Sequence, residues 1–179
     1  MMELAIDDKI FESFIDYELI EKRIRVLAIQ INVDYENKTP MIIGVLNGSF
    51  IFMADLMKAL EISCEVAFLK VSSYQDMQST GKIKEEYVLN TNIENRDIIL
   101  IEDIIDTGNT LDYLINKLKT KNPASIKVAS LLLKPDALQK EIDEIAYVGF
   151  EIANDFVVGY GLDYNGLGRN TKNIYRLKT

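Results

Sequence analysis

The segment from Ile98 to Leu111 constrains the fold more than any other part of the chain. It reads Ile-Ile-Leu-Ile-Glu-Asp-Ile-Ile-Asp-Thr-Gly-Asn-Thr-Leu: an apolar run, two adjacent carboxylates, two further apolar residues, a small-residue turn and the beginning of a helical pattern. This order is typical of a buried strand that leads through a loop into a helix, which is where α/β sheets collect their chemistry.

The loop in this segment is suited to an anion, because it offers hydroxyls, a glycine and free backbone N–H groups at the start of a helix. Three acids, Glu102, Asp103 and Asp106, stand at the same place without a lysine. Carboxylates would repel a bare phosphate unless they serve sugar hydroxyls, a divalent cation or a proton. The segment therefore predicts a site for a sugar phosphate with a metal.

Predicted strands and helices alternate along the rest of the chain. A helix is expected over 17–31, because its apolar residues fall on one face. The other expected elements are a helix over 50–60, a strand and a helix over 97–120, and strands over 41–46, 63–71, 86–89, 125–133, 145–150, 156–160 and 174–177. Such alternation implies a parallel sheet with right-handed crossovers. We therefore expect one α/β domain over residues 1–179, in which helices flank a five-stranded parallel sheet and the N- and C-terminal segments form a small hood.

Composition excludes several classes of function. The net charge of −8 argues against a nucleic-acid surface, which needs clustered Lys and Arg. The absence of histidine excludes Ser-His-Asp triads, His-ligated zinc and imidazole general bases. The single Cys64 excludes an intramolecular disulfide, and its place in a predicted strand indicates a buried, inert thiol. Any metal site should therefore use oxygen ligands, with Mg²⁺ favoured.

The sequence also bears on location. The first eight residues carry acids where a secretory signal would carry basic residues, and the longest apolar runs are far shorter than a membrane span. We therefore expect a cytoplasmic protein.

The pattern of hydrophobics, Glu-Asp, two apolar residues and Asp-Thr-Gly-x-Thr resembles the phosphoribosyl-pyrophosphate signature of the type I phosphoribosyltransferases. The resemblance implies that Glu102 and Asp103 hold ribose hydroxyls and share in a Mg²⁺ shell. It also implies that Asp106 contacts the phosphoribosyl group and takes the purine proton, and that the following loop cradles the 5′-phosphate. These loop residues are Thr107, Gly108, Asn109 and Thr110. The alternative is a solvated strand end followed by an ordinary capped helix.

A second strand-to-helix turn, Leu46-Asn47-Gly48-Ser49, could hold a pyrophosphate or could simply cap a helix. Members of the family use this turn for pyrophosphate, often with Lys where Asn47 stands. Because Asn47 supplies no charge, the resemblance places pyrophosphate on Asn47, Gly48, a metal and Arg169, which matches the family's pyrophosphate-contacting Arg.

The polar stretch from Ser72 to Lys84 has no periodicity and could be a surface hairpin loop. Its Ser73-Tyr74, followed by Gln-Ser-Thr-Gly, also resembles the lid of the hypoxanthine–guanine branch of the family. A lid has a chemical role, because an oxocarbenium-like intermediate must be kept from water.

Two motifs resemble the purine site of the same branch. Lys134, which alone could be a solvated strand end, matches the cation that meets the 6-carbonyl of the ring. In the segment from Phe156 to Tyr164, the resemblance implies that Phe156 stacks on the base, Val157 meets the ring edge through its backbone, and Asp163 touches both base and metal. The alternative for 156–160 is plain strand core, which would not explain Asp163.

The resemblance thus implies a purine-salvage transferase that joins hypoxanthine or guanine to the ribose-5-phosphate of phosphoribosyl pyrophosphate with Mg²⁺. It also implies a homodimer or homotetramer. A nucleotide-sensing regulator on the same fold is the alternative, although the acidic balance and the intact purine motifs speak against it. A P-loop kinase is weaker still, because no Gly-x-x-x-x-Gly-Lys-Ser/Thr occurs in the chain.

Overall fold

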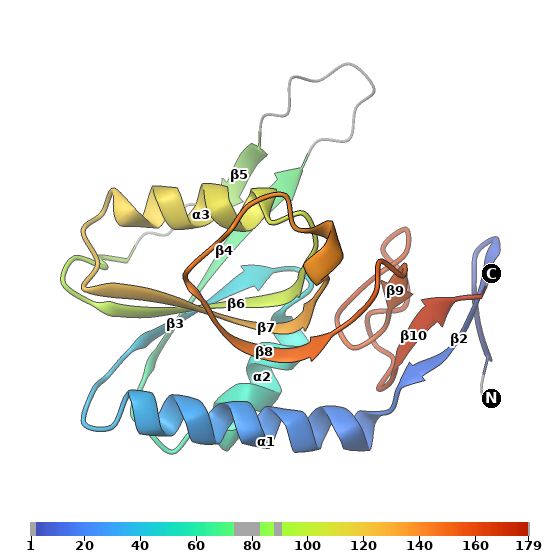
Figure 1. The fold of residues 1–179 in the computed structure, drawn as a ribbon, viewed down its shortest axis with the longest axis horizontal. Helices are drawn as coiled ribbons and strands as arrows, with labels where there is room; N and C mark the ends of the chain where they lie inside the picture. Colours follow the sequence, from blue (N-terminus) through green and yellow to red (C-terminus); the bar gives the residue numbers. More distant parts are fainter. Residues whose placement is uncertain (1–2, 74–82, 88–90, 179) are drawn as a thin grey trace.

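The computed structural model describes residues 3–73, 83–87 and 91–178, and these residues form two sheets and three α-helices (Figure 1). The larger sheet has the strand order β5-β4-β3-β6-β7-β8. Its five parallel strands are β3 (Met41–Leu46), β4 (Glu65–Ser73), β6 (Asp97–Ile105), β7 (Ser125–Leu133) and β8 (Ile145–Glu151). The expected five-stranded parallel sheet is confirmed. The short strand expected over 86–89 is β5 (Ile83–Tyr87), which runs antiparallel at the edge.

Helices cover both faces of this sheet (Figure 1). α1 (Tyr17–Asp34) and α2 (Phe50–Ala59) lie on one face, and α3 (Asn109–Lys119) lies on the other. Successive residues of a strand point to opposite faces, so Ile99 and Ile101 of β6 pack with α1 and α2, whereas Ile98 and Leu100 pack with α3. All four are fully buried, as expected for a strand covered on both faces.

The terminal segments form the small hood that the sequence predicts. It is an antiparallel sheet with the order β1-β2-β10-β9, made of β1 (Glu3–Ile6), β2 (Lys9–Ile15), β9 (Val157–Val158) and β10 (Ile174–Leu177). The strand expected over 156–160 is wrong beyond its two central residues, because the backbone from Gly159 to Gly161 has positive φ angles and leaves the extended region. A 3₁₀-helix, Pro135–Ala137, follows β7 and was not expected.

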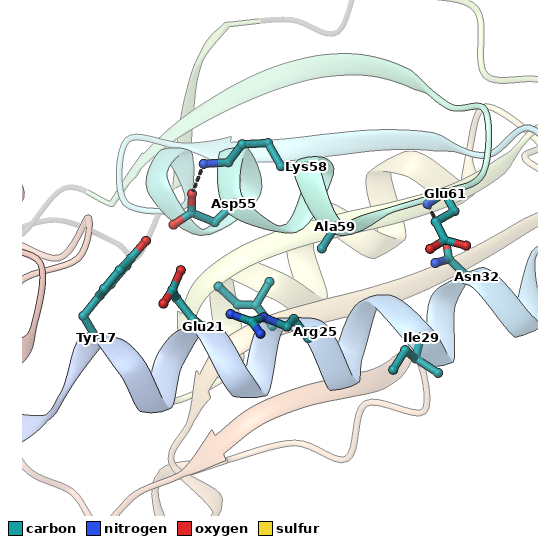
Figure 2. A pocket seen from close by; sticks show the side chains of 10 residues that line it. Tyr17, Glu21, Arg25, Ile29, Asn32, Asp55, Lys58, Ala59 and Glu61 are labelled. Carbon is teal, nitrogen blue, oxygen red and sulfur yellow. Dashed lines mark hydrogen bonds and ion pairs between the residues drawn. The ribbon is translucent and has the colours of Figure 1, made fainter.

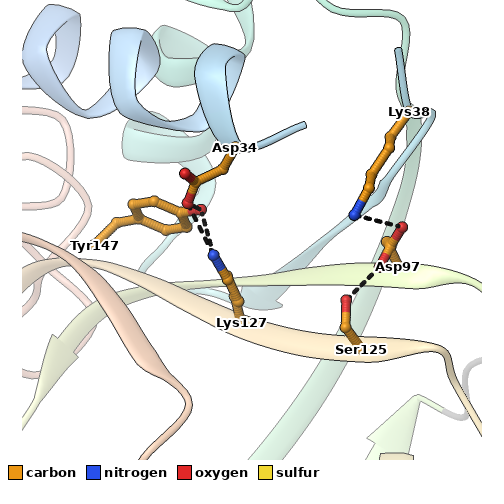
Figure 3. A network of polar contacts seen from close by, with 6 residues as sticks. All are labelled: Asp34, Lys38, Asp97, Ser125, Lys127 and Tyr147. Atoms are coloured by element: carbon orange, nitrogen blue, oxygen red, sulfur yellow. Dashed lines mark hydrogen bonds and ion pairs between the residues drawn. The ribbon is translucent and has the colours of Figure 1, made fainter. Parts of the chain in front are cut away.

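Polar contacts attach the C-terminal end of α1 to the amino-terminal edge of the sheet (Figure 3). Asp34 accepts hydrogen bonds from Lys127 of β7 at 2.8 Å and from the Tyr147 hydroxyl of β8 at 2.5 Å. These two bonds hold the pKa of Asp34 below its usual range. Nearby, Lys38 pairs with Asp97, the first residue of β6. These contacts therefore stabilise the amino-terminal edge of the sheet. The predicted site residues lie at the opposite, carboxyl-terminal edge.

Cys64 corrects one expectation. It precedes β4 instead of lying within it, and it is half-buried, with Sγ 3.9 Å from Sδ of Met57. Burial raises the pKa of its thiol. The part of the chain described here has no helix long and apolar enough to cross a membrane.

Candidate active site

The carboxyl-terminal ends of β3, β6 and β7 bring most of the predicted site residues to one edge of the sheet. β6 continues through both acids to Ile105, and a short turn then leads into α3 at Asn109. Gly108 caps the helix with φ +79°, a left-handed conformation that favours glycine. The sequence order of strand, turn and helix is therefore the order in the structure.

This turn encloses a small cavity of about 100 Å³. Its walls are Glu102, Ile104, Ile105, Asp106, Thr107, Gly108, Thr110 and Leu111. The first N–H groups of α3 lack intrahelical partners and face the helix start, where the helix dipole favours an anion. A hollow of this kind can hold a phosphate group.

A residue that sequence reasoning missed supports the turn from outside. The backbone N–H of Gln139 donates to the carbonyl of Thr107 at 3.1 Å, and the Gln139 side chain accepts from the Asn109 amide at 3.0 Å. The Asn109 side chain is thus engaged with Gln139. No local spacing signals this contact, because Gln139 lies beyond the next strand.

The two adjacent acids face opposite sides of the sheet. Glu102 lines the phosphate-sized cavity on the α3 side and is only 7% exposed, so the alternative of a solvated strand end is wrong. Burial, reinforced by the charge of Asp103, raises the pKa of Glu102 well above its usual value. Burial also raises the pKa of Asp103 to about 6, although a hydrogen bond from the Ile104 N–H at 3.0 Å acts in the opposite direction.

Asp103 meets the second predicted turn at Gly48. Glycine allows this approach, because a Cβ atom at residue 48 would overlap Oδ2 of Asp103 unless the acid or the turn shifted. On its other side, Gly161 lies against the carbonyl oxygen of Gly48 so closely that a Cβ on Gly161 would also overlap it. The Leu46–Asn47 peptide bond at the start of this turn is cis. The turn is therefore enclosed between the signature strand and the C-terminal loop.

The C-terminal loop brings Asp163 and Arg169 to the same place. Arg169 donates to the carbonyl of Gly161 at 2.6 Å and pairs with Asp163 at 2.5 Å. The other carboxylate oxygen of Asp163 accepts from the N–H of Gly166 at 2.7 Å. Both charged groups act on Asp103, since Arg169 lowers its pKa and Asp163 raises it. The structure thus brings Asn47-Gly48, Asp103, Asp163 and Arg169 together.

Lys134 lies at the end of β7, beside the end of β6. Its backbone N–H donates to the carbonyl of Ile105 at 2.9 Å, and its side chain is 9% exposed, so the solvated alternative is wrong. The ammonium donates to Asp106 at 3.1 Å and to Asn154 at 3.4 Å. Asn154 is a second residue that sequence reasoning missed. Lys134 and Asp106, predicted for base and ribose, are thus in direct contact.

The residues around β9, at the start of the C-terminal part of the hood, differ in how deeply they are buried. Val157 and Val158 are buried strand core, whereas Phe156 is 44% exposed, so plain core does not describe it. Its ring packs edge-on against Tyr164, with centroids 5.8 Å apart. Of the predicted lid, Ser73 is the last residue of β4. Tyr74 lies outside the described residues, so the lid stays a prediction.

The donor set available for a metal consists of carboxylates. Among the described residues, no three His, Cys, Asp or Glu side chains gather closely enough to form a metal site by themselves. Mg²⁺ does not need such a cluster, because it commonly uses one or two carboxylates together with water and substrate phosphates. Asp103 and Asp163, at the turn that carries Gly48, fit that requirement.

Comparison with known proteins agrees with this geometry. The phosphoribosyl transferase domain family matches residues 12–165. The chain is 44% identical over 162 residues to a hypoxanthine-guanine phosphoribosyltransferase of Streptococcus mutans, covering 90% of this chain and 89% of that protein. It is 41% identical over 175 residues to a bifunctional protein TilS/HprT of Listeria monocytogenes, covering 97% of this chain but spanning only 27% of that protein's length.

Solved structures give the same result. A crystal structure of a hypoxanthine-guanine phosphoribosyltransferase from Bacillus anthracis aligns with a TM-score of 0.87 and 34% identity, covering 96% of this chain and 99% of that one. The fold, the arrangement of the phosphate-sized cavity and the relatives therefore agree, and the chain belongs to the phosphoribosyltransferase family, in its hypoxanthine-guanine branch.

Proposed function

We propose that the protein is a purine-salvage enzyme. It transfers the 5-phosphoribosyl group of phosphoribosyl pyrophosphate to hypoxanthine or guanine and releases pyrophosphate with the nucleoside monophosphate. The observation that carries this proposal is the ion pair between Lys134 and Asp106, because Asp106 also lines the phosphate-sized cavity together with Thr107, Gly108 and Thr110. The carboxylate of Asp106 thus contacts both the cation proposed for the 6-oxopurine, Lys134, and the cavity proposed for the phosphate.

The proposed chemistry follows from the charges at this edge of the sheet. As pyrophosphate leaves C1 of the ribose, positive charge develops on the sugar ring, and fixed carboxylates stabilise that charge. Glu102, from the α3 side of β6, and Asp103, from the side of Gly48, hold the ribose hydroxyls. Asp106, whose side chain is 50% exposed, accepts the proton that the purine nitrogen loses as it bonds to C1.

Lys134 and the start of the hood bind the purine in this proposal. The ammonium donates to the 6-carbonyl oxygen, the exposed face of Phe156 stacks on the ring, and the backbone of Val157 meets its edge. Lys134 is well suited to this, because it is buried and its ammonium donates to two oxygen acceptors, on Asp106 and Asn154. A bound purine would compete for a donor that is already oriented.

Mg²⁺ is the proposed metal. When bound, it would neutralise the charge of the pyrophosphate leaving group. Asp163 and Asp103 would hold it, while Asn47, Gly48 and Arg169 bind the pyrophosphate itself. The donor chemistry supports a hard cation, since the chain has no His and its Cys64 lies elsewhere, next to Met57.

We further propose a cytoplasmic homodimer or homotetramer. An exposed apolar stripe along α1 supports self-association, because its residues recur at helical spacing on one face and have no cover in the described part of the monomer. These residues are Leu19, Val26, Ile29 and Val33. The non-catalytic regulator has no comparable support.

The test is a turnover assay with phosphoribosyl pyrophosphate, Mg²⁺ and a panel of free nucleobases. Turnover of hypoxanthine and guanine, and not of adenine, uracil or orotate, is the expected result. The same assay with EDTA tests the metal. Turnover of adenine or orotate alone would overturn the substrate, and the absence of turnover with every base would overturn the enzymatic function.

A further inference from the structure

We infer that Tyr160 and Asp55 are positioning residues that hold the pyrophosphate turn, residues 47–49, in place for the reaction. This inference rests on the proposed function, because it assigns a role in binding the pyrophosphate group of that substrate. Asp55 belongs to none of the motifs described above, and Tyr160, although it lies within the segment from Phe156 to Tyr164, has no role assigned there. Both act through Gly48 and Gly161, which lie between them and the substrate site.

The contact between the two residues is a part-buried, charge-assisted hydrogen bond. The Tyr160 hydroxyl donates to Oδ2 of Asp55 at 2.5 Å, and Tyr160 as a whole residue is 1% exposed. Burial, followed by the hydrogen bond to Asp55, raises the pKa of Tyr160, so the hydroxyl keeps the proton that it donates. Lys58 pairs with the other oxygen of Asp55 at 2.5 Å. Both carboxylate oxygens of Asp55 therefore have a partner.

Tyr160 occupies a backbone conformation that its side chain must help to maintain. Its φ of +50° lies between those of Gly159 at +100° and Gly161 at +102°. The left-handed region is unfavourable for a residue with a Cβ and persists only where the surroundings determine it. Backbone bonds from Tyr160 N–H to Thr171 at 3.0 Å and from Gly161 N–H to Arg169 at 2.9 Å hold the same segment.

The hydrogen bond between Tyr160 and Asp55 connects the two elements that flank the pyrophosphate turn, α2 and the C-terminal loop. Asp55 belongs to α2, which begins at Phe50, immediately after the turn. Tyr160 precedes Gly161, whose α-carbon lies against the carbonyl of Gly48. The Tyr160–Asp55 bond therefore fixes the distance between α2 and the C-terminal loop, and the turn is held between these two elements. Loss of the bond lets Gly161, and the Arg169 that donates to it, move away from Gly48.

The pair approaches the turn from outside the substrate site. Asp55 and Lys58 line a groove of about 630 Å³ between α1 and α2, together with Tyr17 (Figure 2). The rings of Tyr17 and Tyr160 are 6.2 Å apart, so Tyr17 covers the pair on the groove side. Asp55 thus faces this groove, whereas the contact between Gly48 and Asp103 lies at the proposed pyrophosphate site. This placement distinguishes a positioning role from direct contact with pyrophosphate.

The test compares three variants with a matched control. Tyr160→Phe removes only the hydroxyl, Asp55→Ala removes the acceptor, and Asp55→Asn keeps an acceptor oxygen. Tyr147→Phe is the control, because Tyr147 also donates to a helix aspartate, Asp34, at 2.5 Å, but at the opposite edge of the sheet. The measurements are the affinity for pyrophosphate with Mg²⁺ by calorimetry, the KM for each substrate, kcat and the melting temperature.

We expect Tyr160→Phe and Asp55→Ala to weaken pyrophosphate binding and raise the KM for phosphoribosyl pyrophosphate roughly tenfold, as one charge-assisted hydrogen bond can. The KM for hypoxanthine should stay unchanged. Asp55→Asn should retain most of the affinity, and Tyr147→Phe should lose stability alone.

A purely structural role predicts that Tyr160→Phe and Tyr147→Phe lower the melting temperature alike and leave pyrophosphate affinity unchanged, which would overturn the inference. If Tyr160→Phe does not fold, the two Asp55 variants provide the test. Equal pyrophosphate affinities of Asp55→Ala and Asp55→Asn would also overturn the inference. Wild-type protein that binds pyrophosphate yet turns over no base would overturn the proposed function instead.

Discussion

The ammonium of Lys134 lies 3.1 Å from Oδ2 of Asp106, and this contact joins the ends of two neighbouring parallel strands. Lys134 is buried, whereas the Asp106 side chain is half exposed. The two groups therefore differ in what they can do: the lysine is held in one place, and the carboxylate can reach solvent or substrate. A purine that enters here meets a fixed donor and an adjustable acceptor.

The first prediction concerns the acceptor. Asp106→Asn should lower kcat by about 10²–10⁴-fold, the usual contribution of a positioned proton transfer, and should leave the KM values largely unchanged. Asp136→Asn is the matched control, because Asp136 is an exposed acid in the 3₁₀-helix that follows Lys134. Steady-state kinetics with hypoxanthine measures both. An unchanged kcat for Asp106→Asn would remove Asp106 from the chemical step.

The second prediction concerns the donor. Lys134→Met keeps the apolar stem and removes the ammonium, so kcat/KM for hypoxanthine should fall by about 10–100-fold, as expected for the loss of a hydrogen bond from a charged group. Binding of pyrophosphate should be unaffected. Lys140→Met is the control, because Lys140 also pairs with an aspartate, Asp112, but on the exposed surface. If both variants kept wild-type kcat/KM, Lys134 would have no role in reading the base.

The central sheet was predictable because its strands are buried on both faces and read as nearly continuous apolar runs. β3 and β7 have the bounds expected from the sequence, and the predicted strand-turn-helix order of β6 and α3 is the order observed. β1 and β2 were not assigned as strands. They are half-exposed hood strands, and β2 pairs with β10, more than a hundred residues further along the chain. The local sequence around β2 therefore gives no sign of its partner strand, β10.

The same distinction applies to the site. Motif residues such as Asp106 and Lys134 were found because a fixed spacing carries them, and the structure brings these two together. Gln139, Asn154 and Tyr160 were missed as site residues because each acts through a contact between distant segments. The enclosure of Gly48 between Asp103 and Gly161 likewise depends on three separate loops. Sequence spacing reveals the groups that perform chemistry more readily than those that support them.

The third prediction tests this enclosure. Gly48→Ala would drive its Cβ into the Asp103 carboxylate, so the turn or the acid must shift. Overpacking of this kind typically costs about 1–3 kcal/mol, and we expect the KM for phosphoribosyl pyrophosphate to rise roughly tenfold or more. Gly166→Ala is the control, because its Cβ would meet open space although its φ of +83° also strains the backbone. A Gly48→Ala enzyme with wild-type KM would show that the turn does not hold the substrate.

The fourth prediction concerns the pH dependence of stability in protein free of substrate and divalent cations. Burial raises the pKa of Asp103 from its ordinary 3.8 to about 6 in the folded state. The folded protein therefore binds this proton more tightly than the unfolded chain, and stability falls as pH rises between these two values. The buried Glu102, with its raised pKa, acts in the same direction. The contribution is fully present below about pH 4 and is lost above about pH 6.

Between pH 7 and pH 5, Asp103 should thus add about 1 kcal/mol to the free energy of unfolding, or roughly 3 °C in melting temperature for a chain of this size. Other groups titrate over the same range, so the measured quantity is the difference between wild type and Asp103→Asn at each pH, by calorimetry in EDTA. The free energy of unfolding of the wild type should rise relative to that of Asp103→Asn as the pH falls. If the melting temperatures of the two proteins changed equally with pH, Asp103 would be solvated, and its proposed place beside Gly48 and the ribose would be wrong.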